Sequence, residues 1–292
     1  MLQTHSCQYF MTRKRCYLQG SRRPKHKRDK LLRMAHSTQP APRKGLLAGA
    51  FWLGLTLLML GIGLRQALFV APTEATMGNI QRIFYWHVPS AMLALTFPYV
   101  NLIASVAYLF LRRNNPLAAL TADAIAVAAA EVTLVFATIG LATGMLWGRP
   151  VWGIWWTWDA RLTTFLLLWL LYVAYLMTRR MSASGQTSTL GAVLAIFAAV
   201  DVPIVYMSIR WWRTQHPSPV LTGDGQLDPA MKTAFGWNVL AWAMWGIFIC
   251  VVRYALERRR QRVNQEATLR ALENSIQPET GYLPTQERGN AF

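Results

Sequence analysis

The sequence predicts an all-α integral membrane protein with six transmembrane helices. Of its residues, 53% are hydrophobic and only 15% are charged, against about 25% charged in soluble domains. The hydrophobic residues form six blocks long enough to cross a bilayer, and short basic clusters flank these blocks. We expect every block to be a helix, because backbone polar groups in lipid must be satisfied within their own segment.

Residues 1–44 differ from the rest of the chain, with twelve Lys or Arg, one acid (Asp29) and no apolar periodicity. We interpret them as a basic, disordered extension or as residues upstream of a true start at Met34. A transit peptide is a weaker alternative. This segment supplies +11 of the formal charge of +17. The charge does not indicate a nucleic-acid partner, because the sequence has no RNA-binding motif and no basic face with interleaved aromatic residues.

The six spans divide the chain into three parts. A transmembrane domain occupies residues 45–254, between the extension at 1–44 and a polar tail at 255–292. The predicted spans are residues 45–64, 88–111, 122–147, 162–177, 189–209 and 234–252.

Basic clusters predict the orientation of these spans. The N-terminal extension, the turn at 112–113, the turn at 179–180 and the arginines at 253–262 all fall on one side of a six-span chain. The positive-inside rule makes this side cytoplasmic, with both termini. The three remaining loops then share the opposite side, which is the periplasm in a bacterium with an inner membrane. Multiple passes through the lipid bilayer follow from the same pattern.

One of these loops, residues 147–163, is rich in tryptophan. Gly148, Pro150 and Gly153 are expected to break any regular helix there. An interfacial aromatic belt is one interpretation. However, so many tryptophans in a single loop also suggest an ordered surface for a flat apolar ligand. They are Trp147, Trp152, Trp155, Trp156 and Trp158.

Two histidines, His87 and His216, lie outside the N-terminal extension, and both fall on the predicted periplasmic side. His87 precedes Pro89 at a predicted helix start, where the helix dipole favours a neutral imidazole. Two histidines are too few for a typical zinc site, but they suit haem iron, which needs two axial ligands. Arginines on the same side are candidates to bind haem propionates, with Arg82 and Arg161 among them. Without a C-x-x-C-H motif, covalent c-type attachment is not expected.

Three acids stand close to the spans. Glu131 and Asp201 lie inside them, where they indicate either a polar path or partner contact, or a hydrogen bond that locks two helices. Asp159 precedes a span and is expected to cap its helix. No nucleophile–base pair, phosphate loop or paired carboxylates occur, so the sequence does not predict an enzyme.

The tryptophan-rich loop resembles the WWD signature of haem-handling membrane proteins, and the chain is most similar to the CcmC family within that group. Three further segments support the resemblance. The first is residues 82–90 around His87, and the third is residues 228–231 before the last span. The second is residues 201–216, which contain Trp211, Trp212 and His216. One departure is the sequence Gln215-His-Pro217, where Leu-His-Gln is expected. Proline at 217 restricts the backbone of His216.

The resemblance implies a function in c-type cytochrome biogenesis at the bacterial inner membrane. It implies that haem b is bound non-covalently by the axial ligands His87 and His216, and is passed to the haem chaperone CcmE beside CcmA, CcmB and CcmD. By the same resemblance the five tryptophans and Asp159 form the haem platform. A secondary transporter using Glu131 and Asp201, or a b-type cytochrome that carries electrons, are the alternatives. The sequence leaves open whether haem crosses the membrane through this chain.

Overall fold

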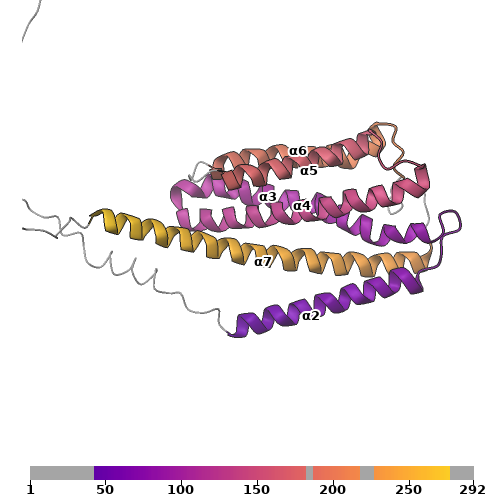
Figure 1. The fold of residues 1–292 in the computed structure, drawn as a ribbon, viewed down its shortest axis with the longest axis horizontal. Coiled ribbons are helices and arrows are strands. Elements are labelled where there is room, and N and C mark those ends of the chain that lie inside the picture. Colours follow the sequence, from indigo (N-terminus) through magenta and orange to yellow (C-terminus); the bar gives the residue numbers. More distant parts are fainter. Residues whose placement is uncertain (1–42, 182–186, 218–226, 277–292) are drawn as a thin grey trace, which may run out of the picture. The chain divides into compact units, whose positions relative to one another are not determined.

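A computed structural model describes residues 43–181, 187–217 and 227–276 (Figure 1). Within these residues the chain is helical and contains no strand, only an isolated bridge between Glu74 and Gly78. Six helices are long and apolar enough to cross a membrane, which confirms the predicted fold class of a multi-pass membrane protein. They are α2 (Arg43–Arg65), α3 (Phe84–Asn114), α4 (Pro116–Trp152), α5 (Ala160–Met181), α6 (Thr187–Trp211) and α7 (Pro229–Ile276).

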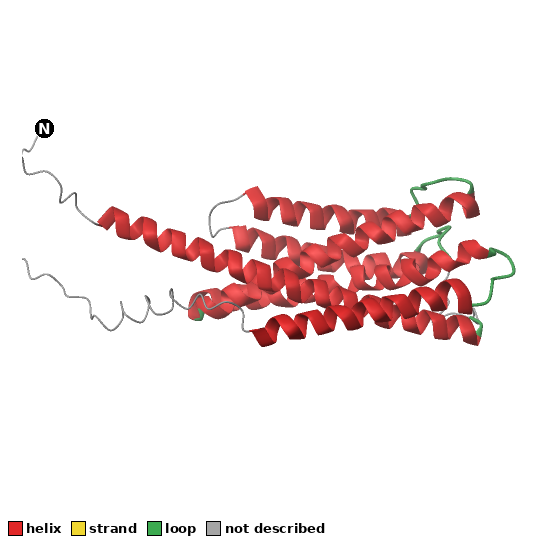
Figure 2. Cartoon of the chain, turned by 60° about the horizontal axis from the view of Figure 1, so that its bottom comes forward, coloured by secondary structure: helices red, strands yellow, loops and turns green. Residues whose placement is uncertain are grey.

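The helices run up and down, so that alternate connections meet at the same end. Figure 2 shows the described loop residues that follow α2, α4 and α6 at one end of the bundle, which we call the histidine end. The α2–α3 connection includes a π-helical turn, Gln66–Val70, and a 3₁₀ turn, Asn79–Ile83. The basic pairs at the ends of α3 and α5 lie at the opposite end. The sequence prediction that the two histidines and the tryptophans share one side therefore agrees with the connectivity.

The core lies between α3, α4, α5 and α6. The most extensive packing joins α3 to α4, and α5 packs on α6. α4 is the most buried span, and its buried face is rich in alanine, which lets neighbouring helices approach closely. Larger side chains then fill the centre, with Phe136, Leu168 and Tyr172 fully buried.

α2 and α7 pack against each other. The amide Nδ2 of Asn238 donates to the Gly63 carbonyl at 3.0 Å and to the Ala234 carbonyl at 2.8 Å. A Cβ at position 63 would lie 3.0 Å from Asn238 Oδ1, so the contact depends on glycine. Much of the rest of α2 is exposed and apolar, as expected for a lipid-facing helix.

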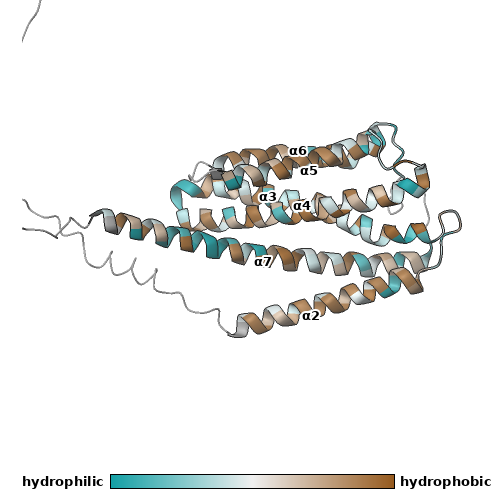
Figure 3. Cartoon of the chain, viewed as in Figure 1, coloured by the Kyte–Doolittle hydropathy of each residue, from teal (hydrophilic) through white to brown (hydrophobic). Residues whose placement is uncertain are grey.

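All six helices extend beyond their predicted spans, α4 and α7 by the most. α4 continues through Gly148 and Pro150 to Trp152, so the expectation that these residues break the helix is wrong. Proline is tolerated in membrane helices when neighbouring groups satisfy the freed carbonyl, and here only Gly153 ends the helix. α7 continues past Val252 to Ile276. The prediction ended at Val252 because hydropathy marks only the apolar part of a helix. Figure 3 shows this hydrophilic continuation of α7. The predicted extension lies outside the described residues up to position 42, as does the tail from 277.

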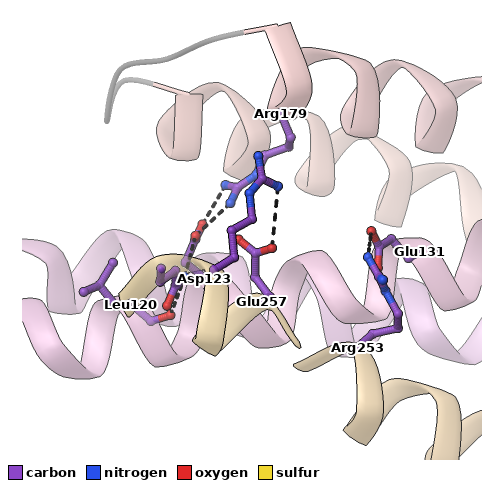
Figure 4. A network of polar contacts seen from close by, with 8 residues as sticks. Leu120, Asp123, Glu131, Arg179, Arg253 and Glu257 are labelled. Carbon is purple, nitrogen blue, oxygen red and sulfur yellow. Dashed lines mark hydrogen bonds and ion pairs between the residues drawn. The ribbon is translucent and has the colours of Figure 1, made fainter. Parts of the chain in front are cut away.

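Ion pairs join α4 to α5 and α7 (Figure 4). Arg179 donates to both carboxylate oxygens of Asp123, at 2.6 and 2.7 Å. Gln261 of α7 donates to the same carboxylate at 3.3 Å. Deeper in the span, Arg253 of α7 forms a two-point ion pair with Glu131. For Glu131 the structure therefore favours a lock between two helices, one of the two interpretations that the sequence left open.

Candidate functional site

His87 lies in the first turn of α3, as the sequence predicted. The 3₁₀ turn Asn79–Ile83 leads directly into this helix, and Pro89 lies inside the helix, in its second turn, and not at the first helical position that proline favours. The imidazole is half-buried against α4, where its Nδ1 lies 3.0 Å from the hydroxyl oxygen of Thr143. Two helices therefore fix where this ring lies.

His216 lies opposite, on the α6–α7 connection. Its Nδ1 is 2.9 Å from the carbonyl oxygen of Pro217, the residue that departs from the family pattern. The ring centroids of His87 and His216 are 6.4 Å apart, and their planes are inclined by 37°. Two residues from distant parts of the chain thus face each other across a narrow gap.

The tryptophan-rich stretch is divided between a helix end and a loop. Trp147 and Trp152 lie in the last turns of α4, with their rings edge to face at 5.2 Å. Gly148 makes room for this arrangement, because a Cβ there would lie 3.0 Å from Cε3 of Trp152. Gly153 ends the helix in the left-handed conformation, with φ of 79°, and its N–H donates to the Arg149 carbonyl.

The remaining three tryptophans follow in the loop to α5. Trp155 and Trp158 are exposed, by 56% and 76%, an unusual amount for rings of this size. Trp156 is half-buried and meets Trp158 edge to face at 5.6 Å. Its indole Nε1 is buried and has no hydrogen-bond partner among the described residues. A buried indole N–H ordinarily has a partner, so this atom marks a place where an acceptor is needed.

Asp159 joins the tryptophan loop to the His216 loop. Oδ1 accepts from the Leu162 N–H at 2.9 Å, which caps α5 as predicted. Oδ2 accepts from the Thr214 hydroxyl at 2.9 Å and from the Gln215 N–H at 3.3 Å. The Thr214 oxygen in turn accepts from the His216 N–H at 3.1 Å. This second contact was not predicted, because Asp159 and Thr214 lie far apart in the sequence.

The two predicted arginines differ in their surroundings. Arg161 donates to the Val205 carbonyl of α6. Burial, together with the positive charge of Arg161, lowers the pKa of His216 below its ordinary value. Arg82 instead donates to the Ala67 carbonyl, to Thr73 and to Asn79 within the α2–α3 connection. No described hydrogen bond joins Arg82 to the two histidines or to the tryptophans.

A protein-only metal site is not found in the described part of the chain, where no group of three His, Cys, Asp or Glu side chains comes together. Two opposed imidazoles instead suit a metal whose other ligands come from a macrocycle. The sequence did not indicate three residues that contact the histidines. Thr143 contacts the His87 ring, and Thr214 accepts from the His216 N–H. Gly144 has no side chain and so leaves room for the His87 ring. A single sequence gives no signal for such contacts between helices.

Fold and site together define a polytopic membrane protein with a pair of opposed histidines beside a tryptophan-rich surface. Comparison with known proteins identifies the family. The CcmC family, described as "Heme exporter protein C", matches residues 33–271. The chain belongs to this family.

Several relatives named "Heme exporter protein C" support the assignment. The chain is 33% identical to the protein of Bradyrhizobium diazoefficiens over 234 residues, which cover 79% of this chain and 86% of the relative. It is 30% identical to the Escherichia coli K12 protein over 239 residues, covering 79% and 95%. It is 32% identical to the Haemophilus influenzae protein over 212 residues, covering 70% and 81%. The family match begins at residue 33, so most of the basic segment 1–44 lies outside it.

Proposed function

We propose that this protein binds haem non-covalently between His87 and His216, and presents it for export in cytochrome c maturation. The observation that carries the proposal is the separation of the two imidazoles. A metal–imidazole bond of about 2 Å, with each ring centroid roughly 1 Å beyond the bonded nitrogen, gives a centroid separation of about 6 Å. The separation of 6.4 Å between His87 and His216 fits an iron atom held between them.

The surroundings of the histidine pair suit the rest of a haem. Exposed indole faces of Trp155 and Trp158 offer an apolar surface for a flat ring. The unpaired Nε1 of Trp156 and the guanidinium of Arg161 are donors for a carboxylate, which haem carries as two propionates. The lowered pKa of His216 keeps this imidazole neutral at neutral pH, and an iron ligand has to be neutral.

The distribution of basic residues supports a position of this site at the outer face of the membrane. At the other end of the bundle, α3 and α5 finish with Arg112, Arg113, Arg179 and Arg180. By the positive-inside rule that end is cytoplasmic, and with it both termini. The histidine end then faces the periplasm of a bacterial cell. Family membership further supports delivery to the chaperone CcmE, with CcmA, CcmB and CcmD as partner subunits.

A transporter that uses Glu131 and Asp201 has less support. Glu131 is neutralised by its ion pair with Arg253. Asp201 is buried, and its Oδ2 has no hydrogen-bond partner among the described residues. None of the described ion pairs links Asp201 to a second charged residue, so a path for an ion is not supported. A b-type cytochrome carrying electrons across the membrane would place histidines at different depths, whereas His87 and His216 meet at one end. Haem handling without bond chemistry is therefore the function that the site supports best.

The test is to purify the full chain from haem-replete cells and to record its absorption spectrum. We expect a Soret band with the sharp visible bands of six-coordinate low-spin haem, extractable by acid acetone because it is not covalently bound. His87→Ala and His216→Ala should each lower the haem content and shift the spectrum. His36→Ala, which changes a histidine of the N-terminal extension, is the matched control. Colourless wild-type protein, or an unchanged spectrum in both site variants, would refute the proposal.

Orientation needs a separate measurement. A cysteine at Thr157, in the tryptophan loop, should react with a membrane-impermeant maleimide in intact spheroplasts, in a background without the native cysteines. A cysteine at Asn114, at the opposite end, should react only after the membrane is opened. The reverse pattern would place the site in the cytoplasm and contradict export.

A further inference from the structure

Thr143 on α4 makes a contact with His87 that the proposed haem site does not by itself require. The Thr143 hydroxyl lies 2.6 Å from the Ile139 carbonyl oxygen, to which it donates its single hydrogen. Its oxygen therefore acts as an acceptor toward Nδ1 of His87, 3.0 Å away. This requires the hydrogen of the neutral imidazole to be on Nδ1. The lone pair is then on Nε2, at the other side of the ring.

Gly144, the next residue of α4, sets how closely the ring approaches. A Cβ at this position would lie 3.3 Å from Cε1 of His87 and 3.8 Å from its Nδ1. The first of these distances is shorter than an ordinary van der Waals contact, so any larger residue would push the ring away from the helix. Thr143 and Gly144 therefore form a seat for His87, one through a hydrogen bond and the other through the absence of a side chain.

We propose that Thr143 is a positioning residue, which holds the His87 ring in the tautomer and rotation that direct Nε2 toward the iron. The inference rests on the proposed haem-binding function and deepens it. Ligand histidines generally donate their second N–H to a fixed acceptor, which orients the ring and raises its basicity. Thr143 supplies this acceptor from a neighbouring helix, and Gly144 lets the His87 ring approach α4 closely enough to reach it.

His216 reaches the same state by a local route. Its Nδ1 faces the Pro217 carbonyl, which can only accept, so the hydrogen is again on Nδ1 and Nε2 is free. The acceptor here belongs to the adjoining residue of the same loop. The tautomer of His216 is therefore set within its own loop, whereas that of His87 depends on the packing of α3 against α4. Changes in α4 should accordingly affect His87 alone.

The experiment titrates the purified full-length protein, in lipid nanodiscs, with haemin. Thr143→Val keeps the shape of the side chain and removes the acceptor, so the apparent affinity should fall by about tenfold or more, as for other partners of metal ligands. The low-spin electron paramagnetic resonance signal should change as the His87 ring rotates. The reduction potential should rise, because a less basic imidazole stabilises ferric iron less.

Three further variants separate positioning from packing. Thr143→Ser restores the hydroxyl and should recover the wild-type affinity, signal and potential. Gly144→Ala should lower the affinity through the displaced ring with Thr143 unchanged. Thr121→Val is the matched control, because the Thr121 hydroxyl on the same helix donates only to the Leu117 carbonyl four residues earlier.

Each outcome bears on the inference. If wild type and Thr121→Val bind haemin through two histidines and Thr143→Val is indistinguishable from them, the positioning role is wrong and the haem site stands. If Thr143→Ser fails like Thr143→Val, packing rather than the hydroxyl is responsible, and the inference is likewise wrong. If the wild-type protein does not bind haemin, both the proposed function and the inference are overturned.

Discussion

Asp159→Asn tests whether the carboxylate that closes the tryptophan loop also holds His216. An asparagine retains one oxygen, which can still cap α5, and asparagine is as good a cap as aspartate. It cannot at the same time accept from Thr214 and Gln215, as Oδ2 of Asp159 does. The substitution therefore removes the link between the two loops and leaves the helix start intact.

The size of the effect follows from the hydrogen bonds that are lost. A hydrogen bond to a charged acceptor contributes about 1.5–3 kcal/mol. Because Asp159 and Thr214 are half-buried and Gln215 is exposed, we take the lower limit. About 1.5 kcal/mol corresponds to roughly tenfold weaker haem binding, if the link serves to hold His216 in place. Thr214→Val should weaken binding at least as much, because the Thr214 oxygen also accepts from the His216 N–H.

The assay is a haemin titration of the single and double variants. Asp159→Asn and Thr214→Val break the same contact, so the double variant should lose little more than Thr214→Val alone. Thr214→Ser should bind like wild type. Asn115→Ala, which removes the cap of α4 at the opposite end, is the control for a lost cap. Full additivity of the two losses, or wild-type affinity in both single variants, would refute the role of Asp159 in holding His216.

Three other predictions concern pH, the ion pairs and a glycine. The pKa of His216 is lowered in the folded protein from an ordinary 6.5, so below pH 6.5 the unfolded chain binds more protons than the folded chain. The melting temperature of the apoprotein should therefore fall as the pH is lowered below 6.5. The melting temperature of His216→Ala should fall less over the same pH range. Asp123→Asn should lower the melting temperature more than Glu131→Gln, because the Arg179–Asp123 pair is the more buried of the two. Its side chains are 12% and 9% exposed, against 41% and 21% for Arg253 and Glu131. Breaking a buried ion pair costs about 3–5 kcal/mol. An equal change in both variants would contradict this. Gly148→Ala should displace the Trp152 ring and change the near-ultraviolet circular dichroism, whereas Gly54→Ala, in open space, should leave it unchanged.

The helices were predictable from the sequence because lipid admits few alternatives. Long apolar blocks have to be helical, and their number and order were confirmed. Their ends were not predictable to the same degree. Gly148 and Pro150 are helix breakers in water, yet they lie within α4, and the polar residues after Val252 continue α7. Hydropathy marks the part of a helix inside the membrane, and local packing decides where the helix stops.

The candidate site was predictable only as a set of residue types. His87 and His216 are the two histidines outside the N-terminal extension, and five tryptophans fall within residues 147–158, so residue type and position alone indicated them. The structure brings the two histidines together. The contacts that orient them were not predictable. Thr143 and Thr214 are ordinary residues whose significance comes from neighbours more than 50 positions away.

α4 also has a consequence for the depth of the site. Asp123 binds Arg179 near one end of this helix, and Thr143 touches His87 near the other. At a rise of 1.5 Å per residue these two positions are roughly 30 Å apart, about the thickness of the hydrocarbon layer of a bilayer. The length of α4 between Asp123 and Thr143 therefore matches the thickness of the hydrocarbon layer. If the Asp123 end of α4 lies at one surface of the membrane, this length sets the His87–His216 pair at the other surface, and the proposed haem site would then be open to the aqueous side without a path through the hydrocarbon layer.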